Sequence, residues 1–128
     1  MKKIVAVFAL ALVVAMLSGC VVQSAPAKPA GNTVTMGPNN YSSGDTITIK
    51  VGDKITFQTE SSGTTHILVV GTNGSAAKEA GAPDFGTTGQ QIDPGKSWVS
   101  PPWTTAGTYH VTCTIHPTTM NLTVTVTG

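Results

Sequence analysis

Polar and apolar residues alternate in short segments along most of this chain. Thr46 to Ile49 and Lys54 to Phe57 alternate one polar with one apolar side chain, and so do Thr108 to Cys113 and Met120 to Thr127. This alternation is typical of a strand with one face in a core. The segment from His66 to Val70 is instead continuously apolar after its histidine, which favours a strand buried on both faces.

Glycine and proline separate these segments. They occur in Gly71-Thr72-Asn73-Gly74, Asp93-Pro94-Gly95 and Ala106-Gly107, and such residues favour turns because glycine adopts positive φ and proline fixes φ. Helical periodicity is weak, and only Ser75 to Ala80 fits one short helical turn. Seven or eight short strands at this spacing predict an all-β fold, an antiparallel Greek-key β-sandwich, over residues 33–128.

The N-terminal segment has a different character. Lys2 and Lys3 precede an unbroken apolar run from Ile4 to Met16, which is too short for a membrane span of about 20 residues but suits the core of a signal peptide. Leu17-Ser18-Gly19-Cys20 then resembles the lipobox of bacterial lipoproteins, in which the signal is cut before a cysteine that becomes lipidated. Residues 1–19 are therefore predicted to be a lipoprotein signal peptide; an ordinary secretory signal with an incidental cysteine is the alternative.

Residues 20–32 would follow as a lipidated cysteine and a flexible tether, since the segment is short, polar and rich in proline and alanine. Lipid on Cys20 would attach the exported protein stably to the outer face of the bacterial cell membrane, on its periplasmic or extracellular side. The remaining hundred or so residues are enough for about one domain.

Charge and cysteine content narrow the function. The chain has no arginine, and once Lys2 and Lys3 are removed with the signal, five lysines face six acidic residues. This balance argues against nucleic-acid binding, which relies on clustered basic residues. With Cys20 lipidated, Cys113 is left as a single thiol in an exported protein, where disulfides are the usual state. A bound metal best explains it.

The segment after the penultimate strand carries the candidate chemistry. Cys113, His116 and Met120 follow one another with two and then three residues between them, on a loop that joins two predicted strands. Two imidazoles and a thiolate with a weak axial thioether form a blue-copper site. The second imidazole would come from His66. By strand alternation, Cys113 and Met120 both point inward, whereas His110 has the opposite parity and is predicted to lie at the surface.

Each candidate also has a simpler explanation. Cys113 could be a buried structural thiol, His116 an exposed loop residue and Met120 a core side chain. His66 could be a hydrogen-bonded core histidine beside an apolar strand. The combination of residue types and spacings favours the metal site over these explanations taken together.

From Thr33 to Gly128 the chain resembles the cupredoxins of the plastocyanin and amicyanin type. Val51 to Phe57 is similar to the early strand pair of that family, Asp93 to Ser97 to the turn of its penultimate hairpin, and Cys113 to Pro117 to its final ligand loop. The resemblance implies one type 1 copper, cycling between Cu(I) and Cu(II), held by His66, Cys113, His116 and Met120. It also implies that electrons pass through His116, with Ile115 and Pro117 as apolar neighbours for partner docking.

Two positions depart from the family pattern. The three residues between His116 and Met120 lie between the two of amicyanin-like loops and the four of plastocyanin-like loops, which leaves the axial bond and the potential open. Many family members carry asparagine after the first histidine ligand, where it ties two ligand loops together, but this chain has Ile67. Contacts beyond the ligands tune a metal site, so the departure bears on the rigidity of the site.

These observations predict a membrane-tethered monomer that carries single electrons between a redox protein donor and acceptor. The short apolar surface at Ile115 and Pro117 suits docking with membrane oxidoreductases. Copper storage or delivery without electron transfer is the alternative, and a metal-free structural or adhesion module is a third. We expect no enzymatic activity, because copper enzymes need further copper sites and the chain has three histidines in all.

Overall fold

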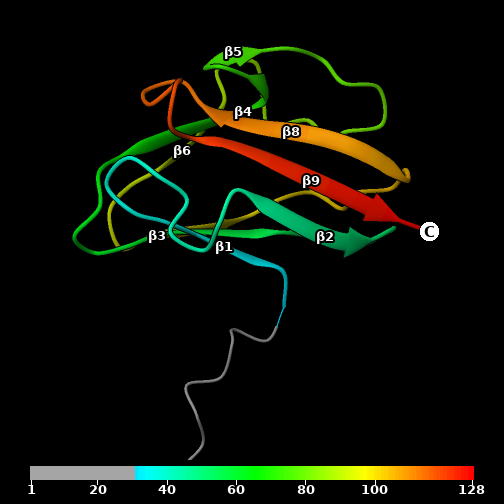
Figure 1. Cartoon of the computed structure of the whole chain (residues 1–128), viewed down its shortest axis with the longest axis horizontal. Helices are drawn as coiled ribbons and strands as arrows, with labels where there is room; N and C mark the ends of the chain where they lie inside the picture. The colour runs from blue at the N-terminus through cyan, green and yellow to red at the C-terminus, as the bar shows by residue number, and fades with distance from the viewer. Residues whose placement is uncertain (1–30) are drawn as a thin grey trace, which may run out of the picture.

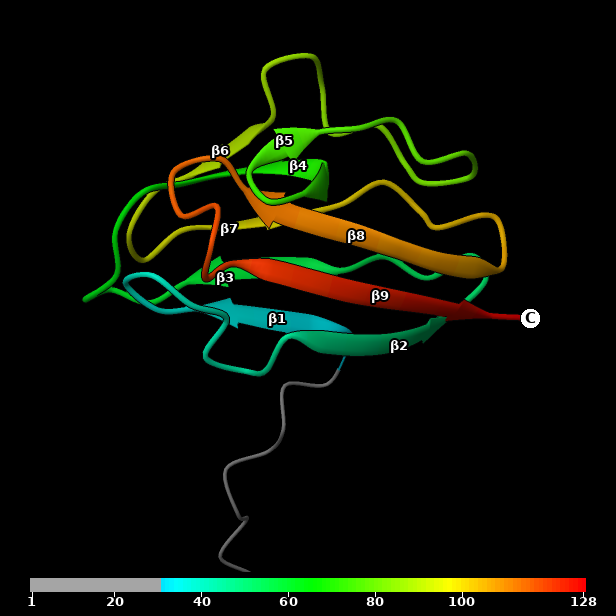
Figure 2. The same ribbon diagram turned by 45° about the horizontal axis from the view of Figure 1, so that its top comes forward.

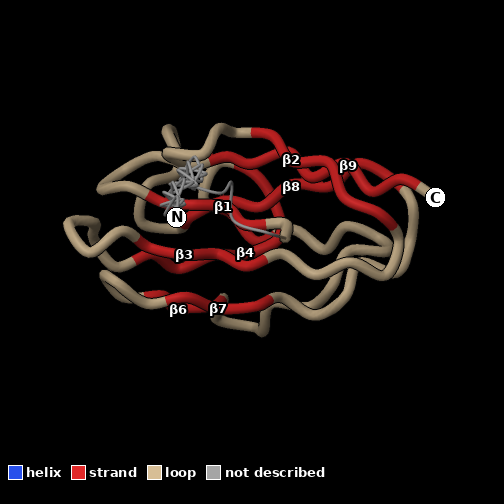
Figure 3. The backbone as a smooth tube through the Cα atoms, turned by 90° about the horizontal axis from the view of Figure 1, so that it is seen from below, coloured by secondary structure: helices blue, strands red, loops and turns tan. Residues whose placement is uncertain are grey.

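The computed structural model describes residues 31–128, and the predicted signal peptide and Cys20 lie outside the described residues. Every regular element in this part of the chain is a strand (Figure 3). No helix there is long and apolar enough to cross a membrane. In chain order the strands are β1 Thr33–Met36, β2 Thr46–Lys50, β3 Thr56–Thr59, β4 His66–Thr72, β5 Ser75–Ala76, β6 Gln90–Ile92, β7 Ser97–Val99, β8 Gly107–Cys113 and β9 Asn121–Thr127.

The strands form two sheets. Three strands pair in the order β1-β3-β7, and five in the order β2-β9-β8-β4-β5, with β6 pairing with β4 beside them. Figures 1 and 2 show β8, β9 and β4 lying across β1 and β3, which are the two layers expected of a sandwich. The all-β sandwich predicted from the sequence is confirmed.

The core between the sheets follows from the alternation in the sequence. In β8 and β9 the residues of one parity are buried, including Val111, Cys113, Leu122 and Val124, whose side chains are at most 1% exposed. Aromatic rings fill the end far from Cys113, where Trp103 is fully buried against Tyr109 at a centroid distance of 5.5 Å. Burial of this apolar surface is the main source of stability for the domain.

The strand number and some strand directions differ from the sequence prediction. Residues 31–128 contain nine strands, and Ser75–Ala76 forms the two-residue strand β5 where one helical turn had been expected. Two pairings, β1 with β3 and β2 with β9, are parallel. The turn after β2 does not make a hairpin with β3, since the Val51 amide donates to the Thr127 carbonyl of the larger sheet and the chain then crosses to the smaller one.

The β4–β5 connection matches its sequence signal. Asn73 and Gly74 form a two-residue hairpin turn in which both residues have positive φ, at 51° and 74°. An Asn-Gly pair is the favoured sequence for such a turn, because both central positions require the left-handed region. The turn brings the start of β5 back beside the C-terminal end of β8.

Candidate metal centre

Strand pairing brings together ligand candidates that are 47 residues apart in the chain. His66 begins β4 and Cys113 ends β8, and these two strands are antiparallel neighbours in the larger sheet, with Leu68 opposite Cys113. Just beyond the ladder, the Thr114 amide donates to the Ile67 carbonyl at 2.9 Å. The start of the ligand loop is therefore fixed to the strand that carries the first histidine.

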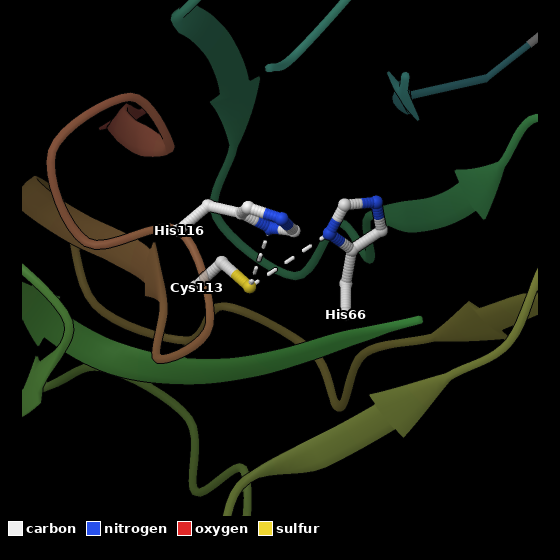
Figure 4. Close-up of side chains that lie close together, drawn as sticks. All are labelled: His66, Cys113 and His116. Atoms are coloured by element: carbon white, nitrogen blue, oxygen red, sulfur yellow. Dashed lines mark hydrogen bonds between the residues drawn. The ribbon is translucent and has the colours of Figure 1, made fainter. Parts of the chain in front are cut away.

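The donor atoms of three residues converge on one point. Nδ1 of His66 and Nδ1 of His116 each lie 3.7 Å from Sγ of Cys113, and the three atoms all lie within 4.8 Å of one another. Figure 4 shows the sulfur between the two rings, whose centroids are 5.2 Å apart. Within residues 31–128 this is the one group of three histidine, cysteine or acidic residues close enough to share a metal ion.

The spacing fits a trigonal metal site. Bonds of about 2.3 Å to sulfur and about 2.0 Å to imidazole nitrogen, the values for zinc, place the two atoms about 3.7 Å apart when they subtend 120° at the metal. Both sulfur–nitrogen distances in the structure are 3.7 Å. One thiolate and two imidazoles are soft and intermediate ligands of the kind that select copper.

The orientation of His66 is set by a backbone carbonyl. Its Nε2 lies 2.9 Å from the Gly37 oxygen, inside the protein, and His66 itself is fully buried. A carbonyl only accepts, so Nε2 must carry the proton, which leaves the Nδ1 lone pair directed at the metal position. Such an outer contact is the usual way in which a histidine ligand is held in one tautomer.

Burial lowers the pKa of His66, the hydrogen bond to the Gly37 carbonyl opposes this effect, and the neighbouring His116 lowers the pKa further. The net direction is down from a pKa of 6.5, so the folded protein favours the neutral imidazole of His66 more than the unfolded chain does. A neutral imidazole is the form that binds a metal.

This shift makes the stability of the metal-free protein depend on pH. Below 6.5 the unfolded chain binds a proton at His66 that the folded chain does not, so unfolding is favoured as pH falls from 6.5 toward the lower folded pKa. Above pH 6.5, His66 is neutral in both the folded and the unfolded chain, and the free energy of unfolding no longer depends on its titration. We expect the urea midpoint to fall between pH 7.5 and pH 5.5. His66→Gln should flatten this slope, and a His110→Gln variant that flattened it equally would contradict the assignment.

The loop after Cys113 closes on itself through main-chain hydrogen bonds. The Cys113 amide donates to the Met120 carbonyl at 3.1 Å, and the Met120 amide donates to the His116 carbonyl at 3.0 Å. Met120 is fully buried at the entrance to β9, as its parity predicted. The loop thus places the thioether residue next to the two ligand candidates that precede it.

Other residues predicted around the site have the expected environments. Ile115 is 48% exposed, and its neighbours His116 and Pro117 are partly exposed. His110 is partly exposed on β8, where its Nδ1 lies 3.0 Å from Glu79, and it does not belong to the cluster of donors.

Two neighbours of the site were not found from the sequence. Gly37 acts through its backbone carbonyl, which has no sequence signal. Tyr41 is buried, and its hydroxyl donates to the Val111 carbonyl at 3.3 Å. Burial raises the pKa of Tyr41 above its usual range, and the charge of nearby Cys113 adds to the effect, so the phenol stays protonated. A lone tyrosine between predicted strands gave no reason to place it there.

Comparison with known proteins supports a copper site on independent grounds. A sequence model of copper-binding proteins of the plastocyanin/azurin family matches residues 32–127. Among solved structures, a reduced amicyanin mutant is 23% identical, with 77% of this chain and 83% of that chain covered and a TM-score of 0.57. The reduced Cu(I) form of another amicyanin mutant at pH 4 is 27% identical, with the same coverage and a TM-score of 0.56. A search of curated proteins gave no match.

Proposed function

Because the chain belongs to the plastocyanin/azurin family of copper-binding proteins, we propose that it is a blue-copper carrier of single electrons, tethered to a membrane through Cys20. The observation that carries this proposal is the convergence of His66, Cys113 and His116 at 3.7 Å from sulfur to each nitrogen. Copper, when bound, supplies the one-electron chemistry by alternating between Cu(I) and Cu(II). Met120 is proposed as the weak fourth ligand.

The protein supplies a fixed and largely dry set of ligands. His66 and Cys113 are both fully buried, and both belong to paired strands. His66 is further held by Gly37. A site that keeps its geometry between two oxidation states needs little rearrangement when an electron moves, which suits a carrier. Storage or delivery is not favoured, because the one thiol is enclosed and not presented on an exposed loop.

The proposed exit for the electron is the partly exposed edge of His116. Large apolar side chains are exposed at three positions among residues 31–128, and Ile115 is the one on the ligand loop. Val51 lies at the opposite end of the sandwich, where its amide bonds to Thr127 at the end of β9. The mature chain has little net charge, so we propose that apolar contact, and not charge steering, governs docking with redox partners.

Electron self-exchange between two copies of the protein tests both proposals. We expect NMR line broadening to give a self-exchange rate that changes little with salt, because screening acts on charge steering alone. Ile115→Lys should slow the exchange by about tenfold, since it places like charges face to face in the encounter. Val51→Lys adds the same charge at a residue of similar exposure, 45% against 48%, and should have little effect. Equal slowing by both variants would contradict docking at the ligand loop.

The proposed membrane attachment has its own test. Cys20→Ser should move the protein from the membrane fraction to the soluble fraction, because lipid would be attached to the Cys20 sulfur. Cys113→Ser removes the other cysteine of the chain and should leave the protein with the membrane. Retention of the Cys20→Ser protein on membranes would disprove lipid anchoring.

A further inference from the structure

Thr112 has an environment that its place in the strand does not predict. It lies between Val111 and Cys113, which face the core, so its own side chain projects from the outer face of the larger sheet. An outward threonine would ordinarily meet solvent, yet Thr112 is fully buried. The cover is the Asn73-Gly74 turn, and Figures 1 and 2 show the β4–β5 hairpin beside the end of β8 and the loop that follows it.

The Thr112 hydroxyl connects this turn to the ligand loop. The Gly74 amide donates to Thr112 Oγ1 at 2.9 Å, and Oγ1 donates to the Met120 carbonyl at 3.0 Å. A hydroxyl has one proton, and here it is used toward the carbonyl while a lone pair accepts from the amide. Both bonds are therefore satisfied together, and loss of the hydroxyl would leave a buried carbonyl with one partner fewer.

Asn121 makes a second connection of the same kind. It is the cross-strand partner of Thr112 at the start of β9. The Asn73 amide donates to Asn121 Oδ1 at 2.7 Å, and Asn121 Nδ2 donates to the Pro117 carbonyl at 2.9 Å. Rotating the amide group by half a turn would set donor against donor and acceptor against acceptor, so the two bonds specify one orientation.

Close packing adds a third contact between the turn and the loop. Gly74 has a φ of 74°, and a Cβ placed on it would lie 2.5 Å from Cβ of Pro117. Only glycine leaves room for the turn to lie this near the ligand loop. The loop is thus held at two points between His116 and the start of β9, namely at Pro117 and at Met120.

We propose that Thr112 and Asn121 are positioning residues that brace the copper-ligand loop against the Asn73-Gly74 turn. The inference rests on the proposed function, because it assigns the loop a role in holding copper. The brace fixes the carbonyl of Met120 and so the place of its thioether relative to the three converging donors. It also supplies rigidity that the apolar side chain of Ile67 does not, since Ile67 contributes its backbone carbonyl alone to the loop.

The test compares Thr112→Val, which has nearly the same shape without the hydroxyl, with Thr112→Ser, which keeps the hydroxyl. In the metal-free protein, exchange of the Met120 amide relative to the Val124 amide should be about tenfold faster in Thr112→Val, the order set by losing one hydrogen bond. Thr112→Ser should stay near the wild type. In the copper-loaded protein, Thr112→Val should shift the paramagnetic-resonance hyperfine splitting and the reduction potential. Thr112→Ser, which keeps the hydroxyl, should have the wild-type values of both.

Ser100→Ala is the matched control. Ser100 is also buried and hydrogen-bonded, to the Ile55 amide and to Trp103 Nε1, but near the other end of the sandwich. It should lower overall stability without changing the exchange ratio or the copper spectrum. If Thr112→Val does not fold, Asn121→Ala gives the same readouts through the second connection.

An unchanged exchange ratio in the folded Thr112 or Asn121 variant, or a Thr112→Ser protein that behaves like Thr112→Val, would overturn the brace. Failure of the wild type to give a blue copper spectrum would instead overturn the proposed function. The exchange measurement needs no metal, so the two failures are distinguishable.

Discussion

Replacing Cys113 by serine is expected to abolish the intense visible absorption of the copper-loaded protein. That absorption belongs to the bond between Cu(II) and a thiolate, and Cys113 is the one cysteine among the described residues. Its sulfur is also the atom on which both histidine nitrogens converge. Visible and paramagnetic-resonance spectra of the variant should therefore show either no bound Cu(II) or a colourless site of a different class.

Met120→Leu provides the contrast for this result. Because a thioether is a weak axial donor, the variant should keep its colour and gain a higher reduction potential. The side chains have similar volumes, so stability should fall by less than about 1.5 kcal/mol. An intense blue band that survived Cys113→Ser would show that the copper is bound elsewhere, and an unchanged potential in Met120→Leu would remove Met120 from the ligand set.

The largest effect on stability is expected from Trp103→Ala. Trp103 is fully buried, its ring packs against Tyr109 and Phe85, and its Nε1 donates to Ser100. Truncating a buried tryptophan typically costs about 3–5 kcal/mol, which is a large part of the roughly 5–15 kcal/mol that stabilises a domain. Urea unfolding of the metal-free protein would measure the loss.

Trp98→Ala is the natural comparison, because Trp98 also packs on Phe85, and on Phe57, but is partly exposed on β7. Trp98 buries less apolar surface than Trp103, so its truncation should lower the free energy of unfolding by clearly less. Equal losses would mean that the aromatic cluster, and not burial of Trp103 itself, sets stability at this end. The copper spectrum of the folded fraction should be the same in both variants, since neither residue touches the donor atoms.

Local patterning accounts for what the sequence predicted well. Alternation located the strands that became β8 and β9, and the same parity placed Cys113 and Met120 inward, where both are fully buried. The site could be predicted because three of its candidate ligands lie within eight residues, so their relative positions depend on one short loop. Only His66 required a long-range assumption, which the β4–β8 pairing supports.

Pairing between distant strands accounts for what could not be predicted. Nothing in the Thr46–Lys50 segment indicates that its neighbour is the parallel strand β9, because a strand pattern describes faces and not partners. Thr112 has the parity of an exposed residue and is buried only because a turn 38 residues earlier covers it. The role of Gly37 lies in a carbonyl that every residue possesses.

The separation of His66 from the other ligand candidates ties metal acquisition to the order in which the chain folds. The site exists only after β4 has paired with β8, and β8 in turn pairs with β9 on its other side. Contacts between distant segments form late and slowly, because a long loop must close before they are gained. A chain in which β4 and β8 have not yet paired therefore has no complete site, so a copper ion meets its ligands together only once these distant strands have folded against each other.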